Sequence, residues 1–427
     1  MSDRIQAVRG MNDILPEETY GWRSLERAFD ACMDRYGYHQ IRLPLLESTG
    51  LFKRSIGEVT DIVEKEMYTF LDRNGESLTL RPEGTAGCVR ACLEHGLLHH
   101  QVQKVWYCGP MFRYEKPQKG RYRQFTQLGV EVFGIAGVGI ELELIAMCAN
   151  LWKTLGLSDV IHLQLNTLGE LAERERYRET LVAYFRSHVD ALDEDSKRRL
   201  ETNPLRILDS KNKAMQTLIA EAPRLFDALG EESQQHFNAL CSGLDALGIA
   251  YTINPCLVRG LDYYEHTVFE WVSGALGSQS TVCAGGRFDR LIEHLGGDPT
   301  PAVGFAMGAD RLLLLMNTVS SRTFVAPAPM VFIIAEGEGA VVQALCLAET
   351  LREQSPSWSI ITNTSGGRFK HQFKKADKSG ARVALVLGED EVLNKTVCVK
   401  DLRASNEQKT VSQADVYNAV NEIFSQK

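Results

Sequence analysis

The sequence lacks the features that mark membrane, secreted and fibrous proteins. No stretch approaches the roughly 18 consecutive apolar residues of a membrane span, and the charged N-terminus has no apolar signal segment. The ten cysteines are scattered singly without a C-x-x-C pair, so they predict reduced thiols rather than a disulfide framework. Internal repeats and low-complexity segments are also missing. These absences indicate a cytoplasmic globular protein that does not associate with membranes.

An excess of positive charge is missing as well. Lysine and arginine together number 47 against 55 aspartates and glutamates, which gives a formal net charge of −8. A protein with this balance does not coat nucleic acid indiscriminately, so a phosphate-binding surface must be local, and we expect no DNA partner. The 427 residues, of which 44% are hydrophobic, are enough for two or three domains with sizeable cores.

One group of potential metal ligands follows a single helical face, namely Cys88, Cys92, His95 and His99. Its ends are eleven residues apart, a rise of about 16 Å along a helix, whereas ligands lie about 2.0 to 2.3 Å from one zinc ion. A half-buried helix face that ends near Gly96 explains the spacing better. The sequence leaves the identity of any metal ligands unknown.

Local patterns divide the first part of the chain into a helix and strands. Residues 18–36 have the apolar periodicity of an amphipathic helix, and the strand-like segment 41–48 is interrupted by Pro44. Residues 104–115 and 123–134 have the pattern of two long strands, and the polar loop between them predicts a hairpin.

The rest of the chain changes character three times. Residues 169–251 are charge-rich and helical, which predicts an insertion between two strand-rich parts, 1–168 and 252–320. Residues 321–328 have the serine and proline content of a linker. Beyond it, residues 329–427 alternate short apolar runs with helical patterns, which is typical of an α/β domain whose sheet is covered on both faces.

The second strand of the hairpin carries unusual residues on one face. Side chains alternate along a strand, so the apolar positions 128, 130 and 132 predict a buried face. The opposite face carries Phe125, Gln127, Gly129 and Glu131. Such a face is either a solvated surface, which its composition favours, or the floor of a polar pocket. An aromatic side chain and a mid-strand gap favour the pocket, because a solvated face needs neither.

The hairpin also concentrates positive charge in an acidic protein. Residues 113–123 contain five basic residues and only Glu115 as an acid, a local balance of +4. The basic residues are Arg113, Lys116, Lys119, Arg121 and Arg123. This charge is either that of a soluble hairpin tip or that of a clamp for polyphosphate or for the end of a nucleic acid.

A third segment combines small residues with a cation at the start of a helix. Gly304, Ala306 and Gly308 share one strand face, where small side chains let a flat ligand approach the backbone. Arg311 follows in the first turn of an apolar helix, where the helix dipole disfavours a cation by about 0.3 to 1 kcal/mol. We therefore expect an anionic or aromatic partner for Arg311.

Together these segments resemble the class II aminoacyl-tRNA synthetases. Residues 36–47 are similar to motif 1 of that family, residues 111–125 to motif 2 and residues 304–311 to motif 3, although Asp310 stands where the family usually has glutamate. Residues 80–85 and 257–264 are similar to the signatures of the histidine-specific members.

The resemblance covers nearly the whole chain and implies an α+β catalytic domain on a mostly antiparallel sheet, built from residues 1–168 and 252–320. It further implies a helical insertion at 169–251, a C-terminal α/β anticodon-binding domain at 329–427, and a homodimer that forms through motif 1.

The resemblance also implies the chemistry. Such an enzyme activates L-histidine with ATP, assisted by Mg²⁺, and transfers the histidyl group to the 3′ end of tRNA(His). The resemblance assigns the catalytic role to Arg113 and Arg259, which would be fixed cations beside the reacting phosphate. It assigns histidine binding to Glu83, Thr85, Arg113, Gln127, Glu131, Arg259, Tyr263 and Tyr264. It assigns ATP binding to Arg113, Glu115, Arg121, Phe125 and Arg311, and tRNA binding to Lys116, Gln118, Arg123, Arg368, Lys370 and Lys374.

Some roles have alternatives. Thr85 also suits the first turn of a helix, and Tyr263 suits packing better than ligand contact. Residues 366–382 carry six basic residues and one acid, a balance of +5, which fits a solvated helix face as well as a tRNA contact. The whole chain could also be a non-catalytic regulatory subunit or a histidine or tRNA sensor of the same fold, although such proteins would be expected to lose the arginines that this chain keeps.

Overall fold

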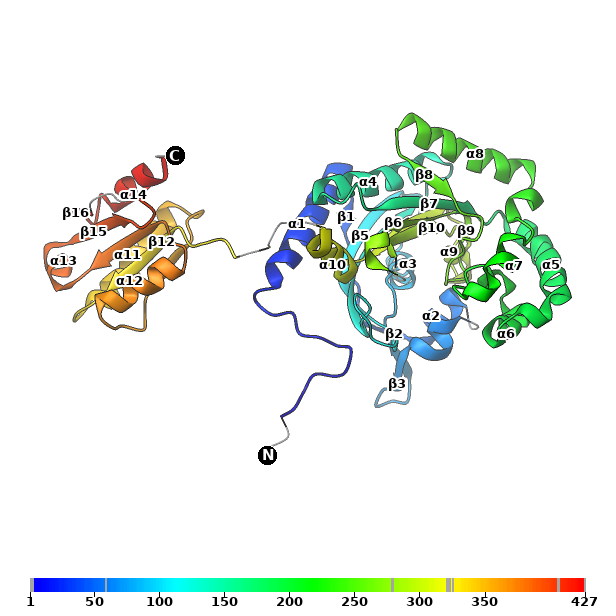
Figure 1. Ribbon diagram of the computed structural model, residues 1–427, viewed down its shortest axis with the longest axis horizontal. Helices are drawn as coiled ribbons and strands as arrows, with labels where there is room; N and C mark the ends of the chain where they lie inside the picture. The colour runs from blue at the N-terminus through cyan, green and yellow to red at the C-terminus, as the bar shows by residue number, and fades with distance from the viewer. Residues whose placement is uncertain are drawn as a thin grey trace. The chain divides into compact units, whose positions relative to one another are not determined.

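The structure is a computed structural model that describes residues 4–57, 60–277, 280–319, 324, 326–404 and 408–425. The chain forms two compact units that divide after Phe324 (Figure 1). Among the described helices, none is both long enough and apolar enough to cross a membrane.

The first unit is built on an eight-stranded sheet in the order β1-β5-β6-β11-β10-β9-β7-β8. Its central pairs are antiparallel, whereas β1 pairs with β5 and β7 with β8 in parallel. The mostly antiparallel sheet predicted for this part is therefore confirmed. The strands are β1 His39–Gln40, β5 Gln103–Phe112, β6 Gln124–Phe133, β7 His162–Thr167, β8 Tyr251–Ile253, β9 Glu265–Val272, β10 Thr281–Arg287 and β11 Ala302–Gly308.

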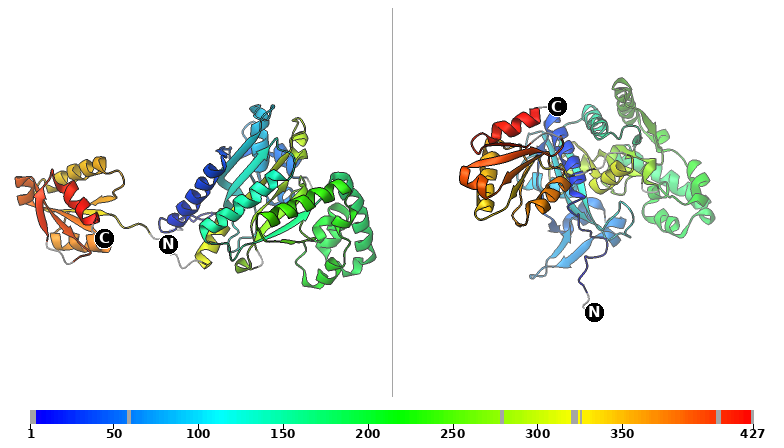
Figure 2. Two further views of the ribbon diagram at one scale, coloured as in Figure 1. Left: turned by 90° about the horizontal axis from the view of Figure 1, so that it is seen from above. Right: turned by 60° about the vertical axis from the view of Figure 1, so that its left-hand side comes forward.

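Helices cover one face of this sheet. The buried positions 128, 130 and 132 of β6 join one apolar core with four helices, so the predicted buried face of this strand is confirmed. The helices are α1 Thr19–Tyr36, α4 Gly139–Leu155, α8 Glu231–Ala246 and α10 Ala309–Val319. Helix α1 ends because Gly37 adopts a left-handed conformation (φ 73°), and it packs along α4 (Figure 2).

The other face carries shorter elements and leaves room for a site. Helix α3 (Thr85–Glu94) buries Cys88 and Cys92 against this face. A three-stranded sheet in the order β2-β4-β3 lies next to α2 Thr49–Ile56. Its strands are β2 Leu46–Ser48, β3 Tyr68–Leu71 and β4 Ser77–Leu80. Of the predicted strand 41–48, only the part after Pro44 is regular, because proline cannot donate to a ladder.

Residues 171–246 form helices, as their pattern predicts, within the same compact unit as the sheet. The longer ones are α5 Leu171–Ser187, α6 Glu194–Thr202, α7 Gln216–Ala220 and α8. Glu173 ties the two ends of this segment together. Its carboxylate accepts from the Glu170 N–H (2.7 Å) at the start of α5 and from the Ser233 hydroxyl (2.7 Å) in the first turn of α8.

The second unit is an α/β fold with a sheet in the order β13-β12-β14-β15-β16. Both β12 and β14 are buried throughout, because α12 covers one face and α11 with α14 covers the other. The elements are β12 Val331–Ala335, α11 Ala340–Gln354, β13 Ile360–Thr362, α12 Phe369–Lys378, β14 Val383–Leu387, α13 Glu389–Asn394, β15 Thr396–Asp401, β16 Lys409–Ser412 and α14 Val416–Ser425. Of the expected linker at 321–328, residues 321–323 and 325 lie outside the described residues.

Candidate active site

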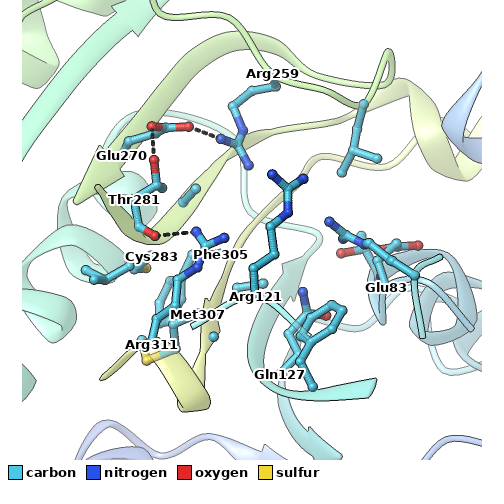
Figure 3. Close-up of a pocket in the computed structure, with 18 of the residues that line it drawn as sticks. Glu83, Arg121, Gln127, Arg259, Glu270, Thr281, Cys283, Phe305, Met307 and Arg311 are labelled. Atoms are coloured by element: carbon cyan, nitrogen blue, oxygen red, sulfur yellow. Dashed lines mark hydrogen bonds and ion pairs between the residues drawn. The ribbon is translucent and has the colours of Figure 1, made fainter. Parts of the chain in front are cut away.

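A cleft of about 310 Å³ opens over the polar face of β6. The β5–β6 hairpin, the loop before β9, and strands β10 and β11 form its walls (Figure 3). The structure brings together in it most residues that the sequence assigned to histidine and ATP. These are Glu83, Thr85, Arg113, Glu115, Arg121, Phe125, Gln127, Arg259, Tyr263, Tyr264 and Arg311.

The start of α3 fixes the first carboxylate. Glu83 is 3% exposed and accepts hydrogen bonds from the main-chain N–H groups of Thr85 (2.7 Å) and Ala86 (2.9 Å). These groups have no partner within the helix, so Glu83 caps them. Burial raises the pKa of Glu83. Gln127 braces the same turn by accepting from the Gly84 N–H (3.1 Å).

Glu131 lies beneath the cleft rather than in its wall. Its side chain is 1% exposed and accepts from the Thr85 hydroxyl (2.7 Å) and the Tyr107 hydroxyl (3.0 Å). A Cβ at Gly304 on the neighbouring strand would collide with the Glu131 carboxylate, so this glycine makes room for the carboxylate. Burial raises the pKa of Glu131 well above its ordinary value.

Gly129 does not leave the open gap that the sequence suggested. Tyr107 of β5 pairs with Gly129 across the ladder, and its ring fills the space over the glycine. A Cβ at Gly129 would collide with the ring, as would one at Gly84. The small residue is therefore required by a protein side chain, which carries its hydroxyl to Glu131.

Four arginines also line the cleft. Arg113 donates to the Pro82 carbonyl (2.8 Å), and its guanidinium lies 5.3 Å from the centre of the Phe125 ring. Arg259 pairs with Glu270, which also accepts from the Thr281 hydroxyl (2.8 Å; Figure 3). The other two are Arg121, from the hairpin loop, and Arg311, from α10.

The compensation of Arg311 differs from the expected anionic or aromatic partner. Its guanidinium donates to two main-chain carbonyls, those of Gly120 (3.1 Å) and Thr281 (2.8 Å). These two carbonyls, one in the hairpin loop and one at the start of β10, can take the place of such a partner because both segments pass close to the first turn of α10. Burial, followed by the nearby Arg121 and Arg113, lowers the pKa of Arg311 to about 10. The cluster of cations thus favours an anionic ligand.

Asp310, which stands where the resemblance to motif 3 implies glutamate, bonds to the sheet. Its Oδ2 accepts from the Thr126 N–H (2.8 Å), which ties α10 to β6. The shorter side chain therefore anchors the strand that carries Phe125 and Gln127.

The first strand of the hairpin is shorter than predicted. It ends at Phe112 instead of continuing to residue 115. The Glu115 N–H bonds to the Arg113 carbonyl (2.8 Å) and the Tyr114 N–H to the Glu66 carbonyl (2.7 Å), so the chain turns away from the ladder. This turn brings Glu115 against Arg121, with which it forms an ion pair.

The residues assigned to tRNA fall into two groups on separate units. On the hairpin, Lys116 and Gln118 are exposed. Arg123 is half-buried, with its guanidinium 3.8 Å from the centre of the Tyr114 ring. On the second unit, Arg368, Lys370 and Lys374 are exposed at and after the start of α12.

Not every lysine of the basic segment 366–382 is equally available. The Lys375 ammonium donates to the Ser365 hydroxyl (2.7 Å), which ties it to its own domain. Lys370, Lys374 and Lys378 are exposed on α12.

Tyr107, Glu270 and Thr281 are further residues of the site that the sequence did not predict. An aromatic residue opposite a glycine in a hairpin is a known pairing, so the register of β5 against β6 would have indicated Tyr107. Glu270 and Thr281 carry no comparable signal, because their contact with Arg259 and Arg311 depends on how three strands and a loop meet.

Comparisons with known proteins agree with the geometry. The sequence matches the Histidyl-tRNA synthetase family over residues 10–312 and an anticodon binding domain over residues 330–423. A histidine–tRNA ligase of Legionella pneumophila strain Philadelphia 1 is 61% identical over 414 residues, which cover 97% of each chain.

Solved structures give the same picture. An apo histidyl-tRNA synthetase of S. aureus aligns with a TM-score of 0.80 at 35% identity, covering 98% of this chain and 100% of that one. A Bacillus halodurans protein described as an ATP phosphoribosyltransferase regulatory subunit/histidyl-tRNA synthetase shares the fold, with a TM-score of 0.63 at 23% identity, covering 90% of this chain and 97% of that one. The chain belongs to the histidyl-tRNA synthetase family.

Proposed function

We propose that this protein is a histidine–tRNA ligase, which activates L-histidine with ATP and then transfers the histidyl group to tRNA(His). The observation that carries the proposal is the convergence of Arg113, Arg121, Arg259 and Arg311 on one cleft beside the buried Glu83. Residues 1–168 and 252–320 would form the catalytic domain, with a helical insertion between them and an anticodon-binding domain at 329–427.

In the first step a carboxylate oxygen of histidine attacks the α-phosphorus of ATP, and the bond to pyrophosphate breaks. Both reactants are anions, so cations fixed in advance supply most of the transition-state stabilisation. Arg113 and Arg259 take this role from opposite walls of the cleft. Each guanidinium already has a fixed partner, the Pro82 carbonyl or Glu270, so little reorganisation is needed when charge develops.

ATP would rearrange the ion pairs at the hairpin. Phe125 and Arg311 enclose the adenine ring, an arrangement that a guanidinium over an aromatic face stabilises. Arg121 would exchange Glu115 for the outer phosphates, because a polyanion is the stronger partner for a cation. Glu115, once released, accepts a hydrogen bond from the adenine amino group.

Mg²⁺ would bind to the phosphates of ATP. In the parts of the chain that the structure describes, no three His, Cys, Asp or Glu side chains are grouped as a metal site. Mg²⁺ bound to nucleotides needs only one or two carboxylates, because water and phosphate oxygens complete its shell.

Histidine recognition would use both nitrogens of the imidazole. Glu131 and Tyr264 offer groups for them, while Glu83, Thr85 and Gln127 receive the α-ammonium group and Tyr263 packs beside it. A site that bonds both nitrogens leaves buried polar groups unpaired when an apolar analogue enters, which discriminates by about 10⁴ to 10⁵. An editing site is then unnecessary.

The second step needs tRNA at two places. Lys116, Gln118 and Arg123 on the hairpin adjoin the cleft and are suited to the acceptor end. Arg368, Lys370 and Lys374 on the second unit are suited to the anticodon arm, since basic side chains position a nucleic-acid backbone without reading its sequence. An acidic remainder of the protein discourages binding elsewhere.

The homodimer would form through the motif 1 region. Leu45 and Leu46 of this region are 43% and 40% exposed, and Phe70 and Leu71 on β3 of the same small sheet are 45% and 69% exposed. Exposed apolar side chains on two strands of one small sheet favour burial against a partner. Light scattering on the pure protein and on Leu71→Glu tests this: a dimer that the charge weakens supports the interface, and a monomeric wild type contradicts it.

The overall proposal is tested by charging purified tRNA(His) with labelled histidine in cytoplasm-like buffer. We expect ATP-dependent charging with histidine and none with the other amino acids. Absence of charging by folded protein would favour the alternative of a non-catalytic regulatory subunit or sensor.

A further inference from the structure

The segment before α1 contacts the outside of the catalytic hairpin. Residues 8–11 form a β-turn in which the Met11 N–H bonds to the Val8 carbonyl (2.9 Å) and Gly10 has φ +84°, a conformation that glycine adopts without strain. The turn aims the Gly10 carbonyl at the start of β6, where it accepts from the N–H groups of Arg123 (2.8 Å) and Gln124 (3.3 Å).

Arg123 links this turn to the cleft residues. Its carbonyl accepts from the Arg113 N–H (2.9 Å), and its Nε donates to the Glu115 carbonyl (3.2 Å). Its guanidinium stacks 3.8 Å from the centre of the Tyr114 ring, and Nη1 reaches the Arg9 carbonyl (3.5 Å). One residue therefore holds the main chain on both sides of the loop that presents Arg113, Glu115 and Arg121.

The contact leaves no free space. A Cβ added to Gly10 would lie 2.9 Å from Cγ of Pro117, a distance that real side chains essentially never show, and 3.0 Å from Cγ of Arg123, which is tighter than most real contacts. Any larger residue must therefore displace the loop as well as strain the turn.

We propose that the turn at residues 8–11 and Arg123 are positioning elements for ATP. They hold the hairpin loop 113–123 in the place where its side chains face the cleft. The proposal rests on the proposed function, and it gives Arg123 a role that does not require tRNA. Histidine binding is expected to depend on it less, because Glu83, Thr85 and Tyr264 come from other parts of the chain.

The first test compares Gly10→Ala with Gly75→Ala in histidine-dependent exchange of pyrophosphate into ATP. Gly75 has nearly the same φ (+86°), but nothing lies within 4 Å of a Cβ added there, so it reproduces the backbone strain without the displacement. A misplacement of about 1 Å can cost about 10²-fold in rate. We expect KM for ATP to rise about tenfold in Gly10→Ala with KM for histidine within about twofold, and Gly75→Ala to match wild type.

The second test uses Arg123→Lys in the same reaction without tRNA. Lysine keeps the charge for a tRNA phosphate but lacks both the Nε–H that bonds to Glu115 and the planar face that stacks on Tyr114. We expect a drop of about tenfold in kcat/KM for ATP. A variant that exchanges like wild type and loses only tRNA charging would return Arg123 to a purely tRNA-binding role.

Amide hydrogen exchange of residues 113–125 gives a readout that does not depend on activity. Protection in this loop should fall in Gly10→Ala and stay at the wild-type level in Gly75→Ala. Equal protection in both variants, together with unchanged KM for ATP, would overturn the proposal. Wild-type protein that shows no exchange of pyrophosphate would contradict the proposed function instead, and the hydrogen-exchange comparison would still decide the positioning role.

Discussion

The two sides of the cleft satisfy their polar groups in different ways. On one side, which we call the carboxylate wall, Glu83 and the Glu131 carboxylate beneath it are bonded to main-chain N–H groups and hydroxyls of the protein. On the other, which we call the arginine wall, Arg121 and Arg259 are paired with Glu115 and Glu270.

The carboxylate wall is therefore held by hydrogen bonds within the protein, whereas the positive charges of the arginine wall are balanced by ion pairs. The carboxylate wall keeps its hydrogen bonds whatever binds, so it is suited to reading the shape and polarity of a small amino acid. On the arginine wall, Glu270 fixes Arg259, whereas the Glu115 partner of Arg121 can be replaced by the phosphates of ATP. We therefore expect changes on the arginine wall to affect the rate of activation most, and changes on the carboxylate wall to affect the choice of amino acid.

The largest effect is expected for Arg259→Ala. Loss of a fixed cation beside the reacting phosphorus should lower kcat for adenylate formation by about 10²- to 10³-fold, whereas the affinity for histidine should stay within a few-fold. Single-turnover adenylate formation and equilibrium binding of histidine measure the two quantities. Arg186→Ala, which removes an exposed arginine paired with Glu201, is the matched control. Equal losses in binding and rate would remove the contrast between the walls.

Glu131→Gln should act on the other wall. We expect kcat/KM for histidine to fall by about 10²-fold, because glutamine replaces one oxygen of the buried carboxyl group with an amide nitrogen, which cannot accept a hydrogen bond from the substrate.

The same variant should be more stable than wild type above about pH 5. Burial raises the pKa of Glu131 above its unfolded-state value, so the folded wild type loses stability as pH rises through the range between the two values. Glutamine carries no such cost. Urea unfolding at pH 4 and pH 8 checks this, and the gain should be present at pH 8 and small at pH 4. A loss of stability at pH 8 would show that the Glu131 charge is stabilising.

Gly129→Ala tests how rigid the carboxylate wall is. The added Cβ collides with the Tyr107 ring, and such overpacking costs about 1 to 3 kcal/mol. We expect urea unfolding to show this loss and kcat/KM for histidine to fall about tenfold as the Tyr107 hydroxyl moves from Glu131. Gly139→Ala is the control, since nothing lies within 4 Å of its added Cβ. Full activity in Gly129→Ala would mean that Tyr107 does not fix Glu131.

The smallest effect is expected on the second unit. Lys370→Ala combined with Lys374→Ala should weaken tRNA binding several-fold and lower the slope of log K against log salt concentration by about 1.4 to 1.8, because two phosphate contacts are lost. Exchange of pyrophosphate should not change, since both lysines belong to the other unit. Lys409→Ala, on the exposed strand β16, is the control. Filter binding at several salt concentrations measures the affinity and its salt dependence. Equal values for wild type, the double variant and Lys409→Ala would contradict this prediction.

The sequence predicted those features that depend on local periodicity. Alternation along residues 123–134 placed Leu128 in the core and Gln127 on the opposite face, which the structure shows to line the cleft, and the small residues of β11 face the cleft as their spacing suggested. The helix α1 and the strands β12, β13 and β14 also follow their apolar patterns.

Features that depend on contacts between distant segments could not be predicted in this way. The Tyr107 ring over Gly129 requires the register of a hairpin, and the carbonyl partners of Arg311 come from residues 30 and 191 positions away. The engagement of Arg123 by Gly10 likewise joins segments more than a hundred residues apart. No local pattern encodes such pairs.

The most direct test of the account is the histidine-dependent exchange of labelled pyrophosphate into ATP by the pure protein, without tRNA. We expect exchange with histidine and with no other amino acid, and we expect Arg259→Ala to lose it. Folded wild-type protein that gave no exchange, or that exchanged with a different amino acid, would contradict the assignment of this cleft to histidine activation.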